Sequence, residues 1–182
     1  DEVEEIRKEL EKLLEEVRRK LEKIIKDIRD LLREDKRKSE RIDRELEKLL
    51  RRLEEIVRDR GPDERVLRDL EEKIKELLDD SRRHADESEK RLRKLLEDAR
   101  RTLERAKKDI DKLEEEVRRR GLPEEMLREV KRVLEEVRRD IERLLEEIRK
   151  VVEEWRKRLE DLKKKNEDSA REVKRRIDEL RK

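Results

Sequence analysis

Apolar residues recur along the chain with a period of 18 residues. In the first third, the set Val3, Ile6, Leu10, Leu13, Leu14 and Val17 returns as Leu21, Ile24, Ile28, Leu31, Leu32 and Asp35, and again as Ser39, Ile42, Leu46, Leu49, Leu50 and Leu53. Spacings of three and four residues place each set on one face of an α-helix. Eighteen residues make about five turns of an unstrained helix, whereas 7- and 11-residue repeats impose a supercoil. The pattern therefore predicts long, straight helices.

All the glycine and proline of the chain stands at two breaks in this pattern, Arg60-Gly61-Pro62-Asp63 and Gly121-Leu122-Pro123-Glu124. Glycine suits the residue just past a helix end, and proline suits the first turn of the next helix. We therefore expect three helices, over about residues 2–60, 62–120 and 123–181, with acidic starts and basic ends that suit the helix dipole. Because short connections make neighbouring helices antiparallel, the expected fold is all-α: an up–down–up three-helix bundle forming one domain over residues 1–182.

Composition narrows the classes of function. Charged residues make up 64% of the chain, yet the net charge is only +2 and acids alternate with bases along the helix faces. A nucleic-acid-binding protein would concentrate positive charge on one face, so we expect no nucleic-acid partner. No apolar run approaches the length of a membrane span, and the absence of cysteine excludes disulfides and thiolate chemistry. We expect neither a membrane partner nor a required protein partner.

The chain resembles a computationally (de novo) designed, parametrically generated, untwisted single-chain three-helix bundle. The resemblance covers the whole chain and rests on the 18-residue register, the two minimal loops, the systematic end charges and a surface of Asp, Glu, Lys and Arg without glutamine. It implies a rigid monomeric scaffold with no natural biochemical activity, substrate or cofactor. It also implies no natural compartment and a soluble protein, cytoplasmic if expressed in a bacterial host.

Several polar or unusual residues interrupt the apolar stripes, and these are the candidate functional residues. They are Asp35, Ser39, Ser81, His84, Ala85, Ser88, Trp155, Asn166 and Ser169. Antiparallel partners should have numbers that sum to about 123 across the first loop and about 243 across the second. Asp35 should then lie level with Ser88 and Trp155. We therefore expect one polar zone in the core.

Three interpretations of this zone stay open. It is a buried hydrogen-bond network that fixes helix register. Alternatively, it is a pocket for a small molecule around Trp155, since Ser, Ala and Asn at Leu-type positions remove volume and add polar groups. The third interpretation is deliberately weakened packing, as in a designed switch or a bundle that binds a partner helix.

Catalysis and metal binding are less well supported by the sequence. Ser81-x-x-His84-x-x-x-Ser88 with Asp35 has the residue types of a hydrolytic triad, but no glycine-rich elbow or oxyanion hole accompanies it. One histidine and no cysteine leave too few inward ligands for a metal site. The sequence therefore predicts a designed structural scaffold that is not an enzyme, with no catalytic residue, metal or cofactor.

Overall fold

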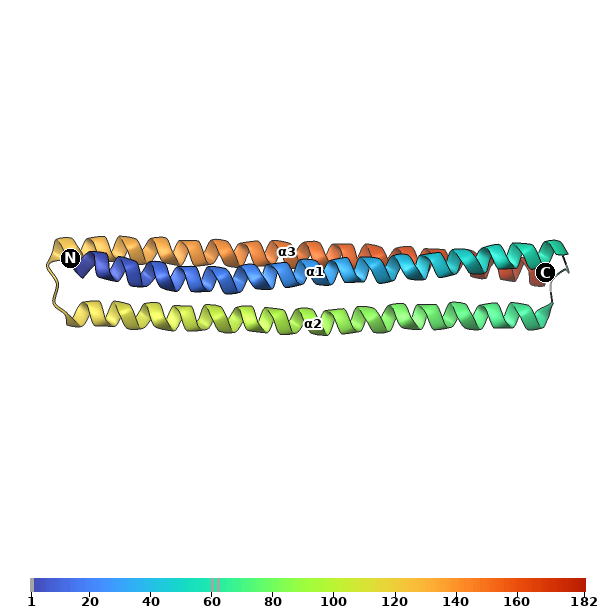
Figure 1. Cartoon of the computed structure of the whole chain (residues 1–182), viewed down its shortest axis with the longest axis horizontal. Coiled ribbons are helices and arrows are strands. Elements are labelled where there is room, and N and C mark those ends of the chain that lie inside the picture. Colours follow the sequence, from blue (N-terminus) through green and yellow to red (C-terminus); the bar gives the residue numbers. More distant parts are fainter. Residues whose placement is uncertain (1, 60, 62) are drawn as a thin grey trace. The chain divides into compact units, whose positions relative to one another are not determined.

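A computed structural model describes residues 2–59, 61 and 63–182. The described residues form three helices, α1 (Glu2–Asp59), α2 (Glu64–Arg119) and α3 (Glu124–Arg181), coloured along the sequence in Figure 1. The predicted all-α fold is therefore confirmed. The predicted helix end at residue 60 and start at residue 62 lie outside the described residues, as does Asp1 of the expected acidic start.

Capping explains why α2 and α3 begin later than predicted. The backbone carbonyl of Asp63 accepts a hydrogen bond from the Leu67 amide at 3.0 Å, and its side chain accepts one from the Arg65 amide at 3.2 Å. Asp63 is thus the N-cap of α2. The Pro123 carbonyl accepts from the Leu127 amide in the same way, so proline lies at the cap rather than in the first turn of α3.

The C-terminal end of α2 has the glycine geometry that the sequence predicts. The Arg120 amide still donates to the Glu116 carbonyl at 3.1 Å, and Gly121 follows with a φ of +62°. Gly61 has a φ of +76°. This left-handed conformation strains residues that carry a Cβ, so both breaks use glycine for its backbone freedom.

Contacts divide the chain into two compact units, the first comprising Asp1–Arg29 and Leu92–Glu153 and the second Asp30–Arg91 and Glu154–Lys182. Each contains a segment of all three helices. In the first unit, buried apolar residues come from every helix, among them Leu10, Ile110 and Val130. The expectations of one domain and of straight helices stay predictions.

The second unit shows the direction of each helix. Glu34 and Lys38 of α1 contact Arg91 and His84 of α2, so numbers that rise on α1 fall on α2. Asp43 and Glu54 of α1 pair with Lys165 and Arg176 of α3, so α1 and α3 are parallel. The order is up–down–up, as predicted. One apolar cluster fills the part of this core near the first loop: Ile42, Leu46, Leu49, Leu53, Leu67, Leu70, Ile74, Ala170, Val173 and Ile177.

Candidate functional site

The polar residues that interrupt the stripes all lie in the second unit, and Asp35 is the most deeply buried ionisable group among them. Only 2% of Asp35 is exposed. The Ser88 hydroxyl of α2 donates a hydrogen bond to Asp35 Oδ1. Nε2 of His84, also on α2, lies 2.8 Å from the same oxygen, although its N–H is off the line to Oδ1. Two polar groups of α2, the Ser88 hydroxyl and the His84 imidazole, thus lie against the same carboxylate oxygen of α1.

His84 connects this buried carboxylate to the protein surface. Its side chain is 16% exposed, and the exposed Lys38 places Nζ 3.1 Å from the imidazole Nδ1. One turn beyond, Glu34 and Arg91 form an exposed ion pair at 3.0 Å between the same two helices. Polar contacts therefore run from solvent to the core along the interface of α1 and α2.

Burial controls the charge of Asp35. Loss of hydration raises the pKa of the Asp35 carboxyl above its usual 3.8, against the opposing effects of the Ser88 hydrogen bond and the nearby His84. The net direction is upward because two neighbours on one oxygen do not replace the water that the other oxygen has lost. Asp35 Oδ2 has no hydrogen-bond partner among the described residues.

Asn166 of α3 is the centre of a second group of polar contacts. Its amide joins Ser39 of α1, at 3.1 Å, to Ser81 of α2, at 3.2 Å. We assign the amide with Nδ2 toward Asp43, because Nδ2 then donates to Asp43 Oδ1 at 2.7 Å while the amide oxygen accepts from Ser81. Only this orientation gives the Asp43 carboxylate a donor from Asn166. One side chain thus links all three helices.

Asp43 was not among the residues predicted from the sequence, yet it belongs to this second group. Burial raises the pKa of its carboxyl, against the opposing effects of Lys165 and of a hydrogen bond from Ser169. Its side chain is 14% exposed. A signal for Asp43 was present in the repeat, because the residue 18 positions earlier is Ile25, which is buried.

Trp155 and Ala85 complete the predicted set, and both are buried in the second unit. The residues one repeat away from Asp35, Ser88 and Trp155 are Leu53, Leu70 and Val173, which belong to one core cluster. That Asp35, Ser88 and Trp155 share a level stays a prediction. The indole Nε1 of Trp155 finds no hydrogen-bond partner among the described residues.

The arrangement of Asp35, His84 and Ser88 differs from a catalytic triad. In a triad the imidazole takes the proton of the nucleophilic hydroxyl, and the carboxylate orients the imidazole from its other side. Here the Ser88 hydroxyl donates to Asp35 rather than to His84. Lys38 lies against the far nitrogen of the ring. The carboxylate therefore stands between the hydroxyl and the imidazole, and neither contact activates Ser88 as a nucleophile.

Among the described residues, no group of three or more His, Cys, Asp or Glu side chains is placed to hold a metal ion. No helix in this part of the chain combines the length and apolar character that crossing a membrane requires.

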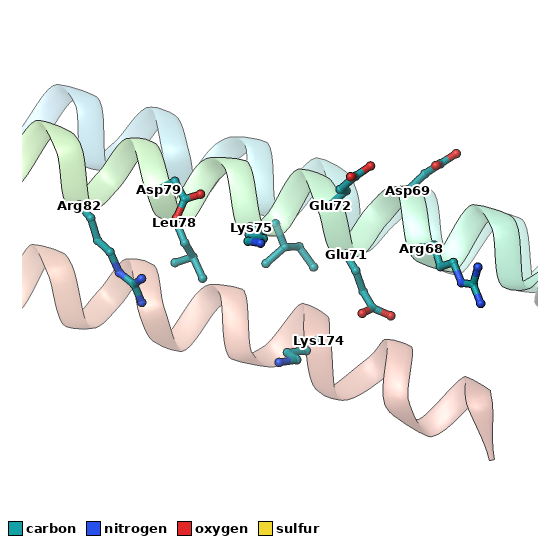
Figure 2. A pocket seen from close by; sticks show the side chains of 10 residues that line it. Arg68, Asp69, Glu71, Glu72, Lys75, Leu78, Asp79, Arg82 and Lys174 are labelled. Carbon is teal, nitrogen blue, oxygen red and sulfur yellow. The ribbon is translucent and has the colours of Figure 1, made fainter.

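A groove of about 680 Å³ lies on the second unit between α2 and α3 (Figure 2). Figure 2 shows Glu71, Leu78 and Arg82 of α2 turned toward α3, and Asp69 and Glu72 turned away. The lining is mostly charged, with both signs present: Arg68, Asp69, Glu71, Glu72, Ile74, Lys75, Leu78, Asp79, Arg82 and Lys174. Trp155, Ser88 and Ala85 are not part of this lining. The groove therefore does not support the predicted small-molecule pocket around Trp155.

Comparisons with known proteins agree with the fold. No protein-family model matches the chain, and a search of curated proteins finds no relative. A solved structure described as a computationally designed three helix bundle is similar over 98% of this chain and 88% of its own, with 22% sequence identity and a TM-score of 0.64. At this identity the likeness concerns the fold alone, and the chain has the fold of a long three-helix bundle.

Proposed function

We propose that the chain is a designed structural scaffold and that its buried polar zone fixes which helix faces pair, and at which height. The chain would then perform no reaction and need no cofactor. The resemblance of the whole sequence to parametric designs supports a designed origin. The role of the polar zone rests on one observation: its contacts, two buried and one partly buried, join every pair of helices. They join α1 to α2 at Asp35–Ser88, α1 to α3 at Ser39–Asn166 and, partly buried, α2 to α3 at Ser81–Asn166.

Such contacts answer a weakness of a periodic core. Stripes that repeat every 18 residues offer similar apolar surfaces at several heights, and three similar stripes also fit the mirror-image order of helices. Alternative pairings then differ little in apolar burial. A buried polar group makes the wrong pairings less stable than the right one. A wrong pairing leaves a donor or acceptor without its partner, which costs about 1–3 kcal/mol of stability for each neutral group. Polar core residues are known to select register in this way in coiled coils.

The first unit supplies the sequence for a test, since its core has apolar residues at the equivalent positions. A repeat-restored variant takes the residue found 18 positions away: Asp35→Val, Ser39→Leu, Asp43→Ile, Ser81→Ala, Ser88→Ala, Trp155→Val, Asn166→Ile and Ser169→Val. We expect this variant to resist heat at least as well as the parent, because replacing buried polar groups with apolar ones is often neutral or stabilising. We also expect its helices to pair in more than one way.

Pairing is measured by electron–electron distances between spin labels on cysteines at Arg37, Lys90 and Lys164, which are exposed and lie on α1, α2 and α3 of the second unit. The parent should give one narrow distance distribution for each label pair. The repeat-restored variant should give broad or double distributions, or a dimer that exchanges helices. A control with Leu21→Ile and Ile148→Leu changes core shape but keeps the polar zone, and it should behave as the parent does. A single narrow distribution in the repeat-restored variant would remove the proposed role.

A further inference from the structure

The contact between Lys38 and His84 assigns the hydrogen of the neutral imidazole. An ammonium group has only hydrogens to donate, so the ring nitrogen beside it acts as the acceptor. That nitrogen is Nδ1, 3.1 Å from Lys38 Nζ. The neutral ring then carries its hydrogen on Nε2, the nitrogen that lies 2.8 Å from Asp35 Oδ1. Both nitrogens of the only histidine in the chain thus have defined roles.

We propose that a proton and the Lys38 ammonium compete for Nδ1 of His84, so that acidification releases Lys38 and turns the contact of His84 with Asp35 into a full ion pair. The proton comes from solvent and adds to the lone pair of Nδ1, and no covalent bond breaks. A protonated ring has hydrogens on both nitrogens and no lone pair to accept from Lys38. Two cations cannot stay this close when one can leave, and Lys38 is exposed and free to turn into solvent.

The surroundings determine which groups take part. On α1, Asp35 attracts an imidazolium, Lys38 repels it, and the charge of Glu34 is balanced by Arg91 of α2. On α2, Ser88 donates to Asp35 and carries no charge. On α3, the half-buried residues in the two turns before Asn166, which contacts Ser81 of α2, are Leu159, Leu162 and Lys163, and only Lys163 can carry a charge. Asp35 and Lys38 are the charged groups in direct contact with the ring.

This inference does not depend on the proposed role of the polar zone in helix pairing, since it concerns one exposed lysine and the ring beside it. If the helices of the repeat-restored variant paired in only one way, the competition between Lys38 and a proton at His84 would still hold in the parent. Conversely, a histidine that ignores Lys38 would leave the pairing proposal intact.

Nitrogen-15 NMR of His84 tests the competition without interference, because the chain has no other histidine. At alkaline pH, the parent should show an unprotonated Nδ1 and a protonated Nε2. Lys38→Met removes the competing cation, so the imidazolium signals should appear at a higher pH than in the parent. Lys36→Met is the matched control, an exposed lysine on the same helix without a contact to the ring, and it should shift the signals by clearly less.

Asp35→Asn provides the opposite change. It removes the anion that favours the imidazolium, so the signals should appear at a lower pH than in the parent. Circular dichroism confirms that each variant keeps its helices. The proposal fails if the neutral ring carries its hydrogen on Nδ1. It also fails if the His84 signals change over the same pH range in Lys38→Met and in Lys36→Met.

Discussion

At the residue scale, Asp35 shows how a carboxylate can occupy a helical core. Both its acceptor atoms are buried, yet its polar neighbours gather on one of them, and Oδ2 is left without a partner among the described residues. A buried charge that is only partly compensated costs stability, which the protein can recover by binding a proton. Asp35 therefore makes the free energy of unfolding depend on pH, and its ionised form lowers the stability of the fold.

Asp35→Asn should stabilise the protein at neutral pH, and this gain should shrink on acidification. The pKa of Asp35 is raised above 3.8 in the folded chain, so between 3.8 and the folded value the folded state binds more protons than the unfolded state. The contribution of Asp35 to the free energy of unfolding is then fully present below 3.8 and is lost as the pH rises through this window. Asparagine has a similar shape and never ionises. Urea unfolding of parent and variant at a series of pH values measures the difference.

Asp86→Asn is the control for this measurement, since Asp86 is exposed on α2 near the same height. It should change the free energy of unfolding by little at any pH. A difference between the parent and Asp35→Asn that grows on acidification would contradict the direction of the Asp35 shift.

Most of this polar zone is predictable from the sequence, because a comparison of the 18-residue repeats with one another shows where polar residues replace apolar ones. Asp35 stands where Val17 and Leu53 stand in the other repeats, and the sum rule placed it level with Ser88. Lys38 was not predictable in this way, because it lies on the exposed face and reaches His84 only through its long side chain. Asp43 was missed because the template followed Ile24 and left out its buried neighbour Ile25.

At the scale of elements, the helices followed from the pattern, whereas their ends depended on single residues. A stripe of apolar residues every three or four positions continues to the last turn but does not mark where it stops. Hydrogen bonds to the carbonyls of Asp63 and Pro123 set the starts of α2 and α3 one or two residues later than the periodicity suggested. The glycines were the more reliable signals, because their positive φ follows directly from the absence of a side chain.

Gly121→Ala should destabilise the protein by about 1 kcal/mol through the backbone alone. A Cβ added at Gly121 would meet nothing within 4 Å, so no clash adds to the conformational cost at its φ of +62°. Urea unfolding measures the loss. Gly121→Asn is the matched control, because asparagine tolerates the left-handed region better than alanine does, and it should cost less. Equal stability of the alanine variant and the parent would show that the loop changes conformation at no cost.

At the scale of the whole molecule, the architecture was predictable because stripe and loop leave few alternatives. Three stripes of similar width must cover one another, and two short loops require antiparallel neighbours. The cross-helix pairs of the second unit show this order directly, from Glu34–Arg91 to Glu54–Arg176. The choice between the two mirror-image orders of helices was not predictable, since the same stripes fit both.

The surface should keep the chain monomeric. Among the described residues no large hydrophobic side chain is exposed, and burial of exposed apolar surface is the main force for association. The ion pairs on this surface are mostly between residues three or four apart on one helix, such as Arg158–Glu154 and Arg175–Glu179. These charged side chains are therefore paired within the chain and do not need charges from a second molecule, and each pair adds little stability.

Light scattering at micromolar concentration should give a mass near the 22.7 kDa of one chain, at both low and high salt. A mass of twice that value at every salt concentration would show a specific dimer, whereas one that appears only at low salt would show that the mixed charges attract a second copy.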